Sequence, residues 1–195
     1  REPDARAEGA LSFDGAAGDL ELTRLACQAR AARIAVPRMR VHGLRGGGPL
    51  TVAGAADVTA DLGVVSRWRR PSRDGVAPPR VDGSLRLRLN AAAAPGGTRL
   101  TLDGALDDLA LTPARGRARL SEKRVALKGD ALLAADAGSL ALDALGLSAE
   151  WLEISAKGVV ADPLGRAAAS LGGMVAVDYD ALAQRLAAVG VNFVG

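Results

Sequence analysis

The residues that could carry out chemistry in this 195-residue chain are few. His42 is the single histidine, and a Ser–His–Asp triad would have to use it, but no Gly-x-Ser-x-Gly motif accompanies it. Cys27 is the single cysteine, so the chain has too few histidine and cysteine ligands for a zinc shell. Cys27 fits a strand position as a small apolar residue. We therefore predict no catalytic residue, no metal site and no cofactor.

Two short motifs begin like ligand-binding loops but lack the residues that would complete them. Asp178 and Asp180 have the spacing that opens a calcium loop, yet the closing glutamate is absent. Capping of a following helix accounts for both carboxylates. The glycines at 46–48 lack the Lys-Ser/Thr pair of a phosphate-binding loop, and we predict a plain turn there.

The formal net charge is +3, and the strongest basic cluster lies in the middle of the chain. Its members are Arg67, Arg69, Arg70, Arg73 and Arg80. Such a cluster can contact the phosphates of nucleic acid or of lipid head groups. We favour a solvated helix end followed by a loop as the explanation, because cations suit a helix C-terminus. Since the other arginines are interspersed along predicted strands, we expect no nucleic-acid partner.

The dominant pattern in the chain is the alternation of apolar and polar residues, which is typical of strands. Apolar residues make up 49% of the chain and aromatic residues only 3%, so a core would consist mainly of Ala, Leu and Val. The clearest strand covers residues 81–89, and a turn at 95–97 leads to a second strand at 98–103. This hairpin has a polar face and an apolar face. The apolar face carries Leu85, Leu87, Leu89, Leu100 and Leu102.

Further short strands are predicted along most of the chain. They lie at 20–25, 34–36, 39–41, 50–60, 109–111, 117–120, 125–128, 140–142 and 145–147, with a strand pair at 151–156 and 159–160. Pro37 is expected to end the strand at 34–36. Two short helices are predicted, one at 62–70 capped by Asp61 and one at 180–189 ended by Gly190.

These elements predict a mainly β fold: a curved antiparallel sheet of amphipathic strands, open as a groove, with two short helices. A closed sandwich or barrel would produce the same alternation, so it remains an alternative. Residues 1–9 are predicted to be disordered or a loop, and residues 10–195 form one β-rich segment with a candidate boundary at the loop 71–80. The first residue is Arg1 rather than Met, and we interpret the chain as an internal piece of a larger protein.

Residues 58–68 and 175–185 both read as an apolar strand, an aspartate and a short helix, a weak internal repeat. The second copy belongs to the stretch Leu171-Gly172-Gly173-Met174-Val175-Ala176-Val177-Asp178-Tyr179-Asp180. It follows the strand-forming segment 151–163. Together these segments resemble the AsmA-like superfamily of bacterial envelope proteins, and the likeness extends over most of residues 49–189.

The resemblance implies a non-catalytic segment of an inner-membrane-anchored periplasmic protein that takes part in phospholipid transport or outer-membrane biogenesis. Acyl chains would slide along an apolar β-groove while the head groups stay in water. The implied groove lining is the leucine set of the hairpin: Leu85, Leu87, Leu89, Leu100 and Leu102. Contact with the membrane would come through parts of the parent protein outside this chain. The alternative is a structural or protein-binding β-repeat module, and the oligomeric state stays open.

Overall fold

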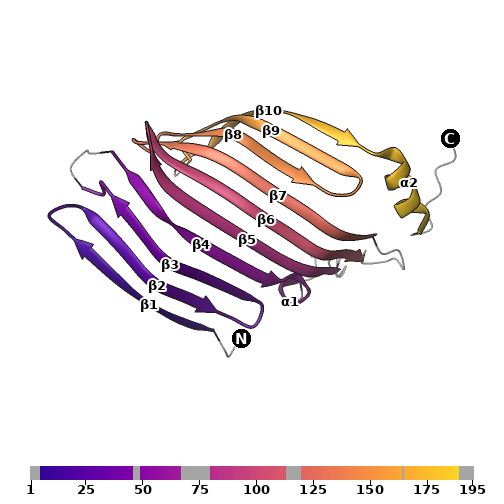
Figure 1. Cartoon of the computed structure of the whole chain (residues 1–195), viewed down its shortest axis with the longest axis horizontal. Helices are drawn as coiled ribbons and strands as arrows, with labels where there is room; N and C mark the ends of the chain where they lie inside the picture. The colour runs from indigo at the N-terminus through magenta and orange to yellow at the C-terminus, as the bar shows by residue number, and fades with distance from the viewer. Residues whose placement is uncertain (1–4, 46–48, 67–79, 113–119, 164, 189–195) are drawn as a thin grey trace.

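Consecutive hairpins build a single antiparallel sheet in which every strand pairs with the next one along the chain. The computed structural model describes residues 5–45, 49–66, 80–112, 120–163 and 165–188. Within these residues ten strands lie in the order β1 to β10, with no crossover. Figure 1 shows a twisted, curved sheet with β1 at one edge and β10 at the other.

The strands are β1 (Arg6–Asp14), β2 (Asp19–Gln28), β3 (Ala32–His42), β4 (Thr51–Asp61), β5 (Arg80–Ala94), β6 (Gly97–Thr112), β7 (Leu120–Ala134), β8 (Ser139–Ser148), β9 (Leu152–Ala161) and β10 (Ala168–Val177). The helices are α1 (Leu62–Ser66), after β4, and α2 (Tyr179–Ala188), after β10. Because β4 and β10 run in the same direction, both helices lie at the same end of the sheet (Figure 1).

This architecture confirms the predicted fold class of a mainly β, curved antiparallel sheet with two short helices. The sheet does not close into a barrel, since β1 and β10 pair only with β2 and β9 in the described residues. The part of the chain that the structure describes does not form a two-layer sandwich either, because all ten of its strands belong to one sheet. The closed alternative is therefore wrong.

The N-terminal prediction needs a correction. Strand β1 begins at Arg6, inside the segment 1–9 that was expected to be disordered or a loop. Its polar residues give no apolar alternation, but an edge strand needs only one neighbour, and Ala7 pairs with Cys27 of β2. Residues 1–4 and most of the candidate boundary at 71–80 lie outside the described residues, and β5 begins at Arg80.

Several predicted short strands are halves of longer ones. The segments 140–142 and 145–147 both belong to β8, and the predicted pair 151–156 and 159–160 is the single strand β9. The segments 98–103 and 109–111 likewise merge into β6. Segment 125–128 lies inside β7, which also includes Leu120; residues 117–119 lie outside the described part. The glycines inside these strands look like turns in sequence but hold extended positions.

Strand β3 also continues where the sequence predicted an end. It passes through Pro37, and the register with β4 shifts between Ala35 and Arg38. A proline has no amide hydrogen to donate, so an irregularity in the ladder is where a strand accommodates it. The two helices are confirmed near their predicted positions: α1 starts after Asp61, and α2 covers Tyr179–Ala188. Residues 67–70 of the first predicted helix, and residue 189 with the predicted stop at Gly190, lie outside the described residues.

Candidate functional site

The apolar face of the sheet is continuous across all ten strands. Residues that pair across neighbouring strands point to the same face, so the register defines rows of side chains. One row consists of Ala7, Cys27, Ile34, Val58, Leu87, Gly104, Leu127, Leu147, Ile154 and Val175. It contains no polar side chain from one edge of the sheet to the other.

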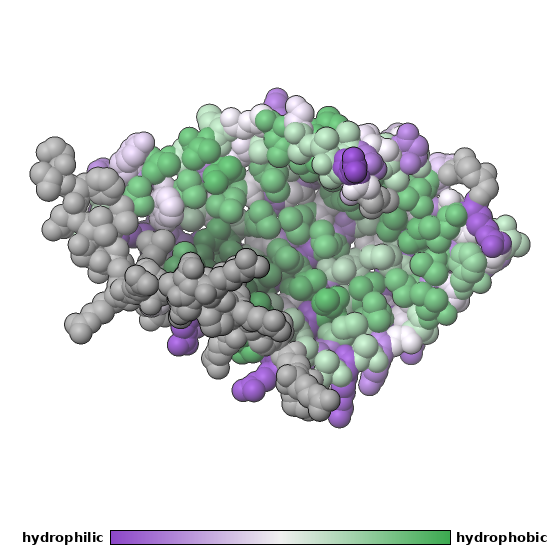
Figure 2. All heavy atoms as spheres, turned by 180° about the vertical axis from the view of Figure 1, so that it is seen from behind, coloured by the Kyte–Doolittle hydropathy of each residue, from purple (hydrophilic) through white to green (hydrophobic). Residues whose placement is uncertain are grey.

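A second row, further along the strands, has the same character. Its members are Leu11, Leu22, Met39, Gly54, Ala91, Leu100, Ala131, Leu142, Gly158 and Leu171. With strands about 4.8 Å apart, ten strands span about 43 Å in the direction of the hydrogen bonds. Figure 2 shows this face: in the part not drawn in grey, hydrophobic side chains predominate and the strongly hydrophilic ones lie mainly toward its rim. We call it the apolar face.

The five leucines predicted to line a groove lie together on this face. Leu85 pairs with Leu106, Leu87 with Gly104, and Leu89 with Leu102. Leu100 pairs with Ala91, so the set covers the middle of the β5–β6 hairpin. Leu89 remains 43% exposed, and the other four are half-buried. The predicted set is thus one contiguous patch, in contact along its edges with further apolar residues of β4 and β7.

Within the described residues, no second layer covers the apolar face as a globular domain would cover its core. Among the described residues the only buried hydrophobic side chains are small or β-branched: Ala31, Val36, Ala105, Ala110, Val125 and Ala131. The chain exposes 13067 Å², whereas a compact monomer of this mass exposes about 8600 Å². A single-layer sheet contributes to this excess, because the leucines on its apolar face stay partly exposed.

The opposite face is polar, and many of its arginines are paired with carboxylates on neighbouring strands. Arg99 of β6 places Nε 2.9 Å from Asp130 of β7 and Nη2 2.9 Å from Asp143 of β8. The hydrogen bond to Asp130 and the charge of that carboxylate raise the pKa of Arg99 above its ordinary value. Arg86 of β5 likewise donates hydrogen bonds to the carboxylate of Asp107 on β6. Cations paired in this manner leave less free positive charge for a polyanion.

A shallow hollow of about 960 Å³ lies on this polar face, over β5 to β10. Small residues form its floor, among them Gly146 and Gly172, and Lys128 and Lys157 stand in its lining. Three aspartates also line it, so its charges are mixed rather than of one sign. Its lining has neither histidine nor cysteine, and no group of acidic, histidine or cysteine residues in the described part of the chain could hold a metal ion.

The remaining candidates for chemistry occupy structural positions. His42 ends β3, and its Nδ1 lies 2.9 Å from Asp19 of β2 on a half-exposed part of the surface. Cys27 lies in β2 on the apolar face, half-buried. In the basic cluster, Arg80 is paired with Asp82, and residues 67–73 lie outside the described part. The glycines at 46–48 also lie outside it.

Both predicted aspartate caps are present. The Asp61 carboxylate accepts a hydrogen bond from the Val64 amide at the start of α1. Asp178 accepts bonds from the amides of Asp180 and Ala181, both at 3.0 Å, at the start of α2. The spacing that resembles a calcium loop is therefore a helix cap, with Asp180 in the first turn of α2.

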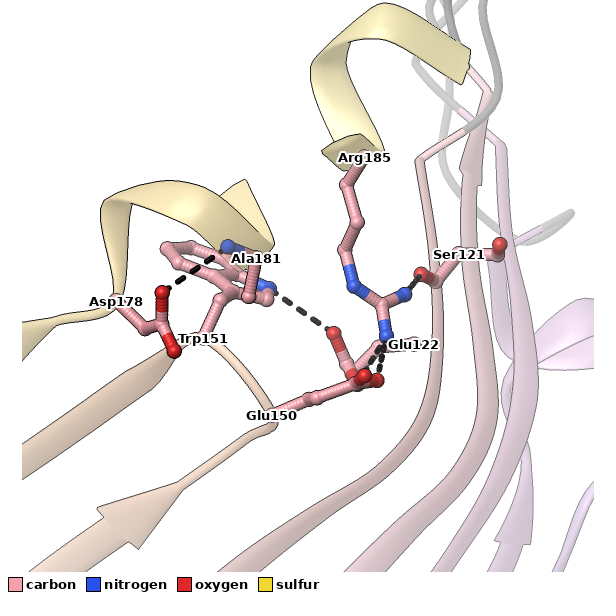
Figure 3. A network of polar contacts seen from close by, with 7 residues as sticks. All are labelled: Ser121, Glu122, Glu150, Trp151, Asp178, Ala181 and Arg185. Carbon is pink, nitrogen blue, oxygen red and sulfur yellow. Dashed lines mark hydrogen bonds and ion pairs between the residues drawn. The ribbon is translucent and has the colours of Figure 1, made fainter. Parts of the chain in front are cut away.

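A polar cluster that the sequence did not reveal fixes α2 against the end of the sheet (Figure 3). Glu122 of β7 is only 6% exposed. It accepts a hydrogen bond from Trp151 Nε1 at 2.9 Å and lies 3.3 Å from Arg185 of α2. Arg185 also reaches Glu150 and the Ser121 carbonyl. We call this group, Glu122, Trp151, Glu150 and Arg185, the helix anchor.

No helix within the described residues has the length and apolar character needed to cross a bilayer. Comparison of the chain with protein-family models, with curated proteins and with solved structures finds no match.

Proposed function

We propose that this chain is a non-catalytic segment of an AsmA-like envelope protein and that its apolar face contacts the acyl chains of phospholipids. The observation that carries the proposal is the pair of uninterrupted apolar rows across ten strands, with no second layer of the described structure over them. An apolar surface of this extent needs an apolar partner, because large exposed apolar patches mark interaction sites.

An acyl chain suits this surface physically. A hydrocarbon tail makes no demand for hydrogen bonds, and each buried CH₂ group contributes about 0.8 kcal/mol. One lipid tail extends about 15 Å, half of the hydrocarbon thickness of a bilayer. A face about 43 Å wide accommodates several tails side by side. Since leucine and alanine offer no fixed polar contact, the tails are free to slide, and the head groups remain in water at the rim.

The family and the location are parts of the same proposal. The strand–aspartate–helix units at β4–α1 and β10–α2 support the AsmA-like resemblance, because both have the predicted order and both aspartates cap. On the same resemblance we propose that the chain lies in the periplasm, within a protein anchored to the inner membrane by other segments, and takes part in phospholipid transport or outer-membrane biogenesis. The pairing of arginines with carboxylates supports our expectation that nucleic acid is not a partner.

The test is direct binding of a phospholipid that carries a fluorescent acyl chain. The purified chain is titrated with this lipid, and bound lipid is separated from free lipid on a native gel. Saturable binding that unlabelled phospholipid competes away, and that Leu127→Asp weakens at least tenfold, is expected, because Leu127 lies in the middle of the first apolar row. Binding equal to that of a soluble control protein, or a Leu127→Asp variant that folds and binds normally, would contradict the proposal.

A structural or protein-binding β-module is the second candidate. It is favoured by one specific observation: the outer side of β10 is unpaired in the described residues, and an open strand edge can pair with another strand. A chain that binds no lipid but forms a complex through this edge would favour that candidate.

A further inference from the structure

The two edges of the sheet differ in how they are protected. Strand β1 carries Arg6, Glu8 and Asp14, and its register with β2 shifts between Glu8 and Ala10. Charges and bulges on an edge strand discourage pairing with another chain. Strand β10 has no charged residue, no proline and no bulge, and its ten residues pair with β9 in one unbroken register. The β10 edge therefore lacks the protection that the β1 edge has.

Three apolar side chains of the edge strand β10 are also largely exposed to solvent. Met174 is 70% exposed, Val175 61% and Leu171 51%. Helix α2 follows this strand directly but does not cover its outer side. It turns back toward β7, where Arg185 lies beside Glu122 in the helix anchor (Figure 3). Among the described residues, the outward-facing amide and carbonyl groups of β10 have no strand partner, and they lie next to exposed apolar side chains.

We infer that β10 pairs with the β10 strand of a second copy of this chain, antiparallel and centred on Gly173. Paired residues must point to the same face, which restricts the registers to those that match odd positions with odd and even with even. In the register centred on Gly173, Leu171 of each copy lies opposite Val175 of the other copy on the apolar face. On the polar face Met174 lies opposite Gly172, which leaves space for it. Because β10 has no charged residue, this pairing brings no like charges together.

The two-fold axis of this dimer is perpendicular to the sheet, so the apolar faces of both copies lie on the same side. The result is a single sheet of twice the width with one continuous apolar face. Edge pairing leaves this face as open as before, so the dimer does not depend on the proposed lipid binding, and either idea can fail without the other.

The first test is the mass of the purified chain in solution by sedimentation equilibrium over a range of concentrations. The variant Gly172→Lys places a charge on the β10 edge, and a Cβ at this position meets no atom within 4 Å, so the single sheet tolerates it. The matched control is Ser12→Lys, on the polar face of the β1 edge. We expect dimers for the wild type and for Ser12→Lys, and a loss of at least tenfold in dimer affinity for Gly172→Lys.

A wild-type chain that stays monomeric at all concentrations overturns the inference. So does a Gly172→Lys dimer as tight as the wild type, because the copies would then associate through another surface, such as the apolar face.

The register has its own test by disulfide formation in a Cys27→Ala background. Leu171→Cys and Val175→Cys are made as two separate variants and oxidised alone or mixed. Because residue 171 opposes residue 175, the mixture is expected to cross-link and each variant alone is not. Cross-linking of either variant with itself, or none in the mixture, contradicts the stated register.

Discussion

The Leu87 side chain occupies the space that a side chain at Gly104 would need on the neighbouring strand. A Cβ at Gly104 would collide with Leu87 Cδ2 and would lie 3.1 Å from the Arg86 carbonyl oxygen. Because Gly104 has no side chain, the Leu87 side chain can pack flat against the sheet over it. Near the β10 edge, Leu171 also lies over Gly158, where a Cβ would lie 3.0 Å from Leu171 Cδ2 and would collide first with the Ser170 carbonyl oxygen.

This contact makes Gly104→Ala a destabilising change. Overpacking of this kind costs about 1–3 kcal/mol, because either Leu87 or the strand must move. The measurement is the free energy of unfolding in urea. The control is Gly146→Ala on the polar face, where the nearest atom to a Cβ lies 4.0 Å away, and a change within about 0.5 kcal/mol is expected there. Equal effects at both positions would show that packing over Gly104 does not matter.

The helix anchor predicts a strong effect of Arg185→Ala. Without the guanidinium, the buried Glu122 carboxylate keeps only its bond from Trp151, and the cost is about 1–3 kcal/mol. The amides of α2 should then exchange with deuterium faster, while those of β2 to β6 stay protected. Glu122→Gln in the same variant removes the unpaired charge, so it should recover part of the loss.

The matched control for the anchor is Glu150→Ala. Glu150 also contacts Arg185, but its side chain is 62% exposed, and an exposed pair contributes at most about 1 kcal/mol. An Arg185→Ala variant no less stable than Glu150→Ala would mean that the burial of Glu122 is not what fixes α2.

The Asp178 cap gives a third prediction. Asp178→Ala removes the acceptor for the amides of Asp180 and Ala181 and costs about 1 kcal/mol. Asp178→Ser keeps an acceptor oxygen and should retain most of the stability. Hydrogen exchange at the first turn of α2 separates the two variants. If serine is as damaging as alanine, the carboxylate acts through its charge rather than as a cap.

The alternation of leucine with arginine was sufficient to predict the fold class and the shared face of the leucine patch, because a period of two fixes the face of every residue. It did not predict strand lengths. Gly158 reads as a turn between two strands, yet it lies within β9 with φ of +155°, beneath Leu171. The sequence shows the glycine but not the neighbour that lies over it.

Contacts between distant segments could not be predicted at all. Glu122 and Trp151 are 29 residues apart, and nothing local to either one indicates their hydrogen bond. The β1 strand was missed for a different reason. Its first residues, 6–9, show no apolar alternation, and Leu11 and Phe13 alone are too few to indicate a strand without the pairing with β2.

The central claim is that the apolar face carries lipid tails, and the most direct measurement is mass spectrometry of lipids extracted from the purified chain. The test variant is Leu87→Asp with Leu102→Asp, which places two charges on the apolar face of β5 and β6. The control is Ala92→Asp with Ser155→Asp, two charges at exposed positions of the polar face. Circular dichroism establishes that each variant keeps its strands.

We predict co-purified phospholipid in the wild type and in the polar-face control, and its loss from the folded Leu87→Asp, Leu102→Asp variant. A folded wild-type chain that carries no lipid, or a test variant that carries as much as the control, would contradict the account.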